Sequence, residues 1–252
     1  SIIKKEKSVE NILHLDNIED ITNRIHQIRE SVHKNGWAII RGLNEKSEVK
    51  KLVEYIKRKH NIENEVKVSG NYKRNSSDFQ RFDVGEFDAS SRLNRYFMFF
   101  PWNNDKIFES INKKQISILR ALSNKGSTYG DIGSKENYNK NRFIMSYVIQ
   151  YPTGGGFMST HREYNQEDVD DRSHVVYLAL TEKNIGFESG GAFVFKGEKK
   201  CLIEDHIELA DMVIYRGDYY HGVESIDREK HLNLNQICGR MILTTVFKYF
   251  QD

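Results

Sequence analysis

Cysteine is scarce in this chain, long apolar runs are missing, and neither sign of charge is in excess. The two cysteines, Cys201 and Cys238, form no disulfide framework, which favours a reducing, cytoplasmic compartment. No apolar run reaches the roughly 20 residues that a membrane-spanning helix needs, and no secretory signal peptide is recognisable. The 38 basic and 36 acidic residues leave a net charge of +2, too small to predict binding to nucleic acid or to an anionic membrane. We therefore expect a small-molecule partner.

At 252 residues the chain is long enough to bury a sizeable core, and we predict one domain over residues 1–252. Its first part, 1–142, is expected to supply helical support, a first strand and loops on the substrate side. Residues 62–104 show no clean period, so loops and irregular strand are expected there, and the polar segment 123–141 is expected to be a lid or a disordered loop. The apolar spacing predicts helices over residues 18–32, 49–56 and 105–122, and a buried strand over 37–42.

From residue 143 onwards, the sequence changes to short β-rich runs separated by turn residues. Six such runs are predicted, over residues 143–151, 174–181, 191–195, 212–215, 221–226 and 241–247. Together with the earlier strand they favour a double-sheet jelly roll that can hold a ligand between its sheets. We therefore predict a mainly β fold with flanking helices (α+β), namely a double-stranded β-helix of the cupin-like jelly-roll type preceded by N-terminal helices.

Two histidines and one carboxylate lie in this β-rich part of the sequence. His161 and Glu163 are two residues apart and follow the glycine-rich segment 151–157, which lets the backbone turn sharply and approach a ligand closely. His221 follows a later strand and turn. Two imidazoles and one carboxylate can occupy one face of an octahedral ferrous ion and leave three positions open for oxygen chemistry. The three residues therefore predict a mononuclear iron site.

An arginine opens the last apolar strand. Arg240 precedes the run 241–247, a position that would bury its guanidinium near the core. A buried guanidinium needs an anion, and a carboxylate bound through two hydrogen bonds would satisfy it. That anion is either the far carboxylate of a dicarboxylic 2-oxoacid, whose other end would chelate the iron, or an internal aspartate or glutamate of the chain.

The content and order of these motifs resemble those of the iron(II)/2-oxoglutarate-dependent dioxygenases. The similar segments are Gly36–Leu43, Tyr151–Glu163, Gly190–Phe193, Asp211–Tyr215, His221–Val223 and Gly239–Arg240. The resemblance implies that residues 143–252 form a jelly-roll core in which His161, Glu163 and His221 bind iron(II). Arg240 would bind the distal carboxylate of 2-oxoglutarate, and O2 would be the second co-substrate. Glu163 stands where aspartate is commoner in this family.

A weaker resemblance concerns the substrate. The segment 80–86, together with Arg92 and Arg95, resembles small bacterial enzymes of this family that hydroxylate or halogenate free amino acids. There Arg81 or Arg95 would hold a substrate carboxylate, and the acidic run 167–171 would meet an ammonium group. The alternatives are a surface loop with internal ion pairs and a solvated run of charge.

We therefore predict a dioxygenase that hydroxylates an unactivated carbon of a small polar substrate, such as a free amino acid, and releases succinate and CO2. A halogenase conflicts with Glu163, which fills the coordination position that chloride needs. The remaining alternatives are a desaturase or cyclase of the same family, and a cupin-like binding protein without turnover. The complete ligand set argues against the binding protein.

Overall fold

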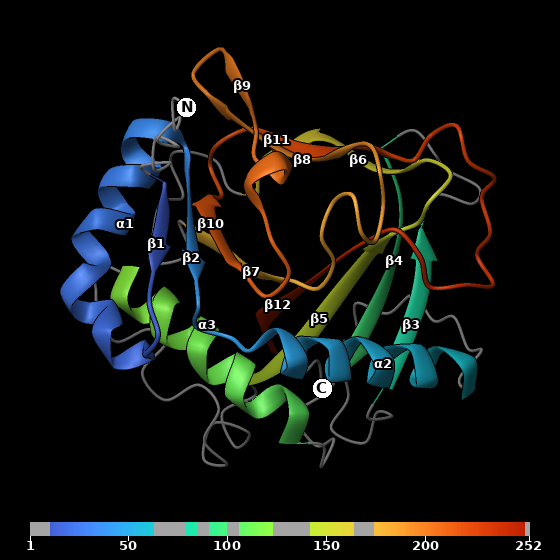
Figure 1. Cartoon of the computed structure of the whole chain (residues 1–252), viewed down its shortest axis with the longest axis horizontal. Helices are drawn as coiled ribbons and strands as arrows, with labels where there is room; N and C mark the ends of the chain where they lie inside the picture. The colour runs from blue at the N-terminus through green and yellow to red at the C-terminus, as the bar shows by residue number, and fades with distance from the viewer. Residues whose placement is uncertain are drawn as a thin grey trace, which may run out of the picture.

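Figure 1 shows the computed structural model, which describes residues 11–62, 79–84, 91–99, 106–122, 142–163 and 174–249. The helices are α1 (Ile21–Asn35), α2 (Lys46–Ile62) and α3 (Glu109–Leu122), with short 3-10 helices at Ile18–Asp20, Lys106–Phe108 and Glu204–His206. The strands are β1 (Ile12–His14), β2 (Trp37–Arg41), β3 (Phe79–Val84), β4 (Arg92–Phe99), β5 (Arg142–Tyr151), β6 (Gly156–His161), β7 (His174–Ala179), β8 (Gly191–Lys196), β9 (Lys199–Leu202), β10 (Met212–Arg216), β11 (His221–Ile226) and β12 (Arg240–Tyr249). None of the helices in this described part is long and apolar enough to cross a membrane.

A glycine joins helix α1 to strand β2. Gly36 adopts a left-handed backbone conformation with φ 94°, and its N–H donates to the Val32 carbonyl at 2.9 Å. This is a common way to end a helix and favours glycine. The chain turns at once into β2, where Ile39 and Ile40 are both fully buried. A strand buried on both faces has a continuous apolar sequence instead of an alternating one, which explains the predicted run at 37–42.

The strands form one sheet that curls back on itself, in the order β1-β2-β10-β7-β12-β5-β4-β6-β11-β8-β9, with β3 paired to β4. The strands from β1 to β5 in this order form a larger wall, and those from β6 to β9 form a smaller wall that faces it (Figure 1). Strand β4 joins the two walls because it pairs with both β5 and β6. The arrangement is a double-sheet jelly roll, which confirms the predicted fold class.

Two apolar layers stabilise this arrangement. Figure 1 shows the helices along the outer side of the larger wall. The outer layer lies between them and the sheet, and its buried residues include Ile28, Leu52, Phe97, Ile118 and Leu243. The inner layer lies between the two walls, and its buried residues include Trp37, Tyr177, Val194, Val213 and Ile242. Side chains of the inner layer surround the candidate site described below.

The segment 62–104 contains more regular structure than the sequence predicts. Strands β3 and β4 pair antiparallel over six residue pairs. Asn94 and Arg95 on β4 are only 2% and 1% exposed, and such buried polar residues hide the apolar alternation on which strand prediction depends. The predicted loop 123–141 and the acidic run 167–171 lie outside the described residues.

Candidate metal centre

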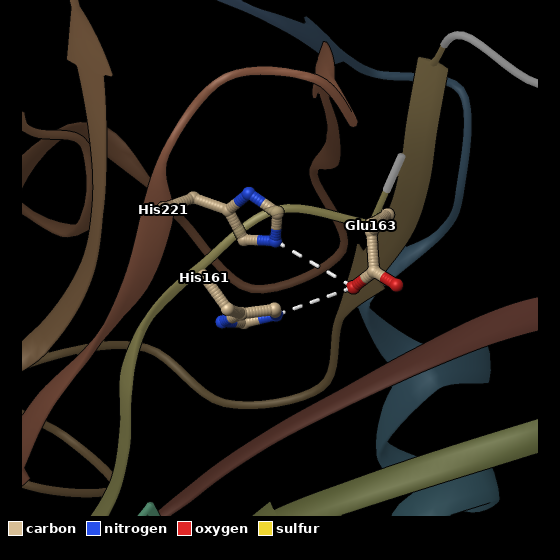
Figure 2. Close-up of side chains that lie close together, drawn as sticks. All are labelled: His161, Glu163 and His221. Carbon is tan, nitrogen blue, oxygen red and sulfur yellow. Dashed lines mark hydrogen bonds and ion pairs between the residues drawn. The ribbon is translucent and has the colours of Figure 1, made fainter. Parts of the chain in front are cut away.

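His161 and His221 lie opposite each other on neighbouring strands. His161 ends β6 and His221 begins β11, and the antiparallel register pairs the two residues directly. Directly paired side chains project to the same side of a sheet, and the two imidazole centroids are 4.3 Å apart. Glu163 follows closely, and its backbone N–H donates to the Gly217 carbonyl at 2.8 Å. Figure 2 shows its carboxylate facing both rings.

The glycine-rich turn before β6 ties that strand to the end of β11. Gly154 and Gly155 adopt φ values of 94° and 117°. Their N–H groups donate to the carbonyls of Asp227 at 3.2 Å and Ile226 at 2.8 Å. A Cβ on Gly154 would lie 2.5 Å from the backbone nitrogen of Leu232, so a larger residue would clash there. The sequence predicts a close approach of this segment to a ligand. In the structure, the glycines permit a close approach to another segment of the chain's own backbone.

The carboxylate of Asp227 completes this frame. It is buried and accepts hydrogen bonds from the backbone N–H groups of Glu188 and Ser189 at 2.8 and 2.9 Å. It also accepts from the Thr153 hydroxyl and the Lys230 ammonium, each at 3.3 Å. One side chain therefore links the segments that precede β6, precede β8 and follow β11. Sequence analysis did not single it out, because its partners are distant in sequence.

The ligand atoms of the three predicted metal ligands lie close together. Nε2 of His161 is 3.3 Å and Nε2 of His221 is 3.6 Å from the same oxygen, Oε1 of Glu163. One ligand atom from each residue lies within 4.8 Å of the others. The His221 side chain is 6% exposed, whereas that of Glu163 is 46% exposed. The cluster is therefore closed on the His221 side and reachable from the Glu163 side.

The hydrogen bonds of the two imidazoles direct their Nε2 atoms toward Glu163. Nδ1 of His161 donates to the Ser159 carbonyl at 2.9 Å, and Nδ1 of His221 donates to the Tyr219 carbonyl at 2.8 Å. Because a carbonyl only accepts, each Nδ1 carries the proton and each Nε2 presents a lone pair. Nε2 of His221 is buried without a hydrogen-bond partner among the described residues. Two lone pairs and a carboxylate around one point attract a cation, and metal-binding histidines are oriented in this way.

The protonation of the cluster leads to the same conclusion. Glu163 has a pKa far below its usual value, chiefly because of the hydrogen bond with His161 and the neighbouring His221. The same carboxylate raises the pKa of His161. The carboxylate therefore stays ionised and stabilises positive charge beside the imidazoles, and a metal ion would supply that charge while both Nε2 atoms bind it through their lone pairs. The residues fit a divalent cation such as iron(II).

Arg240 is buried and has an internal carboxylate partner. Its Nε donates to Oε2 of Glu204 at 2.6 Å, and its Nη2 donates to the Tyr177 hydroxyl at 3.0 Å. Oε2 of Glu204 also accepts from the Ala192 backbone N–H at 2.8 Å. The ring of Tyr151 lies 5.4 Å from the guanidinium carbon. Of the two anions that the sequence left open, the internal one is therefore present, and these bonds within the described residues leave Nη1 available to a second acceptor.

Buried tyrosines connect Arg240 with the metal cluster. The Tyr177 ring lies 6.3 Å from that of Tyr215, which in turn lies 4.7 Å from the His221 ring. Tyr151 flanks the other side of the guanidinium. Burial raises the pKa of all three hydroxyls, so they stay protonated at neutral pH. The interior beside the cluster therefore presents neutral hydroxyl groups around one guanidinium.

The two arginines predicted to face a substrate lie on β3 and β4. Arg95 is buried, and it donates to the Leu234 carbonyl at 2.6 Å and to the Gln150 side-chain oxygen at 3.4 Å. Arg81 is paired in register with Phe97. The substrate role of both arginines stays a prediction.

Comparisons with known proteins add to this picture. No protein-family model matches the sequence, and no curated protein matches it. Among solved structures, a prolyl-4-hydroxylase from Pseudomonas putida is similar with a TM-score of 0.55 at 14% identity, over 93% of this chain and 100% of that chain. A protein from Caulobacter crescentus, assigned to the 2OG-Fe(II) oxygenase family, is similar with a TM-score of 0.57 at 12% identity, over 97% of this chain and 87% of that chain.

The chain has the fold of the 2OG-Fe(II) oxygenases. A prolyl hydroxylase from Trichoplax adhaerens, solved with a peptide fragment of the hypoxia inducible factor oxygen degradation domain, is also similar, with a TM-score of 0.50 at 15% identity over 92% of this chain and 90% of that chain. At such identities the likeness concerns the fold. The activity must therefore be argued from the site.

Proposed function

We propose that this protein is an iron(II)- and 2-oxoglutarate-dependent dioxygenase that hydroxylates an unactivated carbon of a small polar substrate in the cytoplasm. The observation that supports it best is the convergence of His161, Glu163 and His221 within this fold. In the balanced reaction, the substrate, 2-oxoglutarate and O2 yield hydroxylated substrate, succinate and CO2. One oxygen atom enters the substrate and the other enters succinate.

The ligand set has a defined role in this proposal. The Nε2 atoms of His161 and His221 and the carboxylate of Glu163 would hold the iron, and the carbonyls of Ser159 and Tyr219 keep both imidazoles in the tautomer that binds metal. Three protein ligands leave three positions of an octahedral ion for the other reactants. Bound iron(II) supplies activation of O2 and cleavage of the C–H bond.

Arg240 is the proposed anchor of 2-oxoglutarate. Its Nη1 would meet the distal carboxylate, while Nε and Nη2 stay bonded to Glu204 and Tyr177. A charge-assisted hydrogen bond in this buried setting is stronger than one in water. Glu204 weakens the binding of the distal carboxylate, because its negative charge repels a second carboxylate near the same guanidinium.

A free amino acid is the substrate that we propose first, with Arg81 or Arg95 as the predicted carboxylate partner. A peptide is the second candidate, because one structural neighbour is a prolyl hydroxylase in complex with a peptide fragment. A free amino acid carries an ammonium and a carboxylate group on one carbon, whereas an internal residue of a peptide carries neither. A screen should therefore contain amino acids, short peptides and other small metabolites.

The deciding experiment is succinate release from 2-oxoglutarate with anaerobically loaded iron(II), after addition of O2 and each compound. Stimulation by one compound supports the dioxygenase and identifies the substrate, and a product that loses two hydrogens instead of gaining oxygen indicates a desaturase or cyclase. Iron binding without turnover on any compound supports the cupin-like binding protein instead. His221→Ala should abolish release, whereas His33→Ala, which changes an exposed histidine on α1, should not.

A further inference from the structure

The inner face of β4 carries a row of polar side chains. Side chains alternate between the two faces of a strand, so Arg92, Asn94 and Tyr96 share one face and Arg95 lies on the other. Nη1 of Arg92 and Nδ2 of Asn94 both donate to the Tyr96 hydroxyl, each at 3.2 Å. The Tyr96 ring lies 4.9 Å from that of Tyr147, which shares a face of β5 with Ile149, a residue that packs against the inner layer. The row therefore faces the interior between the two walls.

Asn94 presents an acceptor that the described part of the chain does not satisfy. The residue is 2% exposed, and its Oδ1 has no hydrogen-bond partner among the described residues. Its Nδ2 donates to the Tyr96 hydroxyl, which fixes the direction of the amide. A buried acceptor left unpaired costs about 1–3 kcal/mol. A ligand that offers an N–H or O–H to this oxygen would recover that free energy.

Arg92 presents a positive charge beside this acceptor. The side chain is half-buried, and it contacts the hydroxyl of Tyr96 and the ring of that residue at 5.8 Å. No contact with a carboxylate is found for it within the described ranges. A half-buried guanidinium without an acidic partner favours an anionic group on a ligand.

This face of β4 adjoins the metal cluster. Strand β4 pairs with β6, the strand that ends in His161, and Arg92 is in register with Met158. The Ser159 backbone N–H donates to the Ser91 carbonyl at 2.8 Å, so Arg92 directly follows a residue bonded to the strand that carries His161. A ligand bound at the row would therefore lie close to the metal.

From these contacts we propose that Arg92 and Asn94 form the subsite for the polar end of the substrate, with a carboxylate against Arg92 and an N–H group against Oδ1 of Asn94. A free amino acid carries both groups on one carbon. The inference rests on the proposed function and deepens it, because it assigns the substrate carboxylate to Arg92 in place of Arg81 or Arg95, the two arginines predicted from the sequence. The remainder of the amino acid would extend toward the metal cluster.

The co-substrate does not fit this pair. At neutral pH both carboxylates and the keto group of 2-oxoglutarate are acceptors only, so it offers no hydrogen to Oδ1 of Asn94. Its proposed anchor, Arg240, lies on β12, which β5 separates from β4 in the sheet. Two anions can therefore be bound at once, one at each arginine.

The test is calorimetric binding of the protein amino acids to the whole chain under anaerobic conditions, with and without iron(II) and 2-oxoglutarate. At least one amino acid should bind to the wild type, and its methyl ester and N-acetyl derivative should bind more weakly by at least about tenfold. Arg92→Ala and Asn94→Leu should each weaken binding on the order of 10- to 100-fold and leave the affinity for 2-oxoglutarate unchanged.

A matched control is Arg58→Ala, which removes a guanidinium that lies 6.0 Å from the Tyr55 ring on α2. Asn94→Leu keeps a similar volume, and its thermal unfolding should resemble that of the wild type. Unchanged amino-acid affinity in both variants overturns the proposal, as does a loss of 2-oxoglutarate binding or a wild type that binds no amino acid. Failure of iron(II) and 2-oxoglutarate to bind contradicts the proposed function, and the measurements without metal still decide the subsite.

Discussion

Replacing Glu204 by glutamine should make the protein less stable and yet tighten its binding of 2-oxoglutarate. Glu204 and Arg240 form an ion pair whose side chains are 4% and 2% exposed, with 2.6 Å between Nε and Oε2. Glutamine has nearly the same shape, and its amide oxygen can still accept from Nε. The variant therefore changes one quantity, the charge that compensates the buried guanidinium.

The expected magnitudes follow from that change. Loss of one partner from a buried ion pair costs about 3–5 kcal/mol, which for a chain of this size corresponds to a fall in Tm of about 6–20 °C. The distal carboxylate of 2-oxoglutarate would restore neutrality at Arg240. If about 1.4 kcal/mol of the lost free energy returns on binding, the affinity for 2-oxoglutarate rises about tenfold.

Calorimetric unfolding with and without iron(II) and 2-oxoglutarate measures both effects. The rise in Tm that the co-substrate causes should be larger for Glu204→Gln than for the wild type. The control is Glu208→Gln, because that carboxylate pairs with Arg41 at 2.8 Å but is 39% exposed, so its loss should cost no more than about 1 kcal/mol. Weaker co-substrate binding in Glu204→Gln would refute this reasoning, since the carboxylate would then be needed to orient Arg240.

The remaining predictions concern the metal ligands, the arginine and a buried histidine. His161→Ala or His221→Ala should abolish the visible charge-transfer band of anaerobic iron(II) with 2-oxoglutarate, because each leaves two protein ligands; full metal affinity in a variant would remove that residue from the site. Glu163→Gly should suppress hydroxylation by opening a position on the metal, and wild-type rates would mean that another carboxylate is the ligand. Arg240→Gln should weaken 2-oxoglutarate binding by on the order of 2–5 kcal/mol, and an unchanged Michaelis constant would make another cation the anchor. Burial lowers the pKa of His174 from 6.5 to about 4, so the folded state binds this proton less tightly than the unfolded state; stability should be full above pH 6.5 and fall between pH 6.5 and 4, and His174→Asn should reduce that slope in denaturant unfolding.

The jelly roll and the metal cluster could be predicted because their signals are local. Of the strands from β5 to β12, all except β6 and β9 appear in the sequence as short β-rich runs between turn residues. His161 and Glu163 are close in sequence, and His221 begins the predicted strand that pairs with β6. The pairing of β6 with β11 then brings the three residues together.

The partners of the buried arginines could not be predicted in this way. Glu204 lies in a short 3-10 helix and meets Arg240 only because β8 and β12 belong to facing walls. Nothing within a few residues of either side chain indicates that contact. Asn94 likewise reads as an ordinary polar residue until pairing of β4 with two strands buries it.

Because β4 lies between the two walls, the residues proposed to recognise the substrate are separate from those proposed to bind the metal. Strand β4 is held in the sheet by backbone hydrogen bonds to β5 and β6. These bonds do not depend on the side chains that face the interior. The proposed iron ligands lie on β6, on the residues just after it, and on β11. Substitutions at Arg92 or Asn94 can therefore redirect which molecule is recognised while the metal ligands keep their register, so new substrate preferences can evolve without rebuilding the reactive centre.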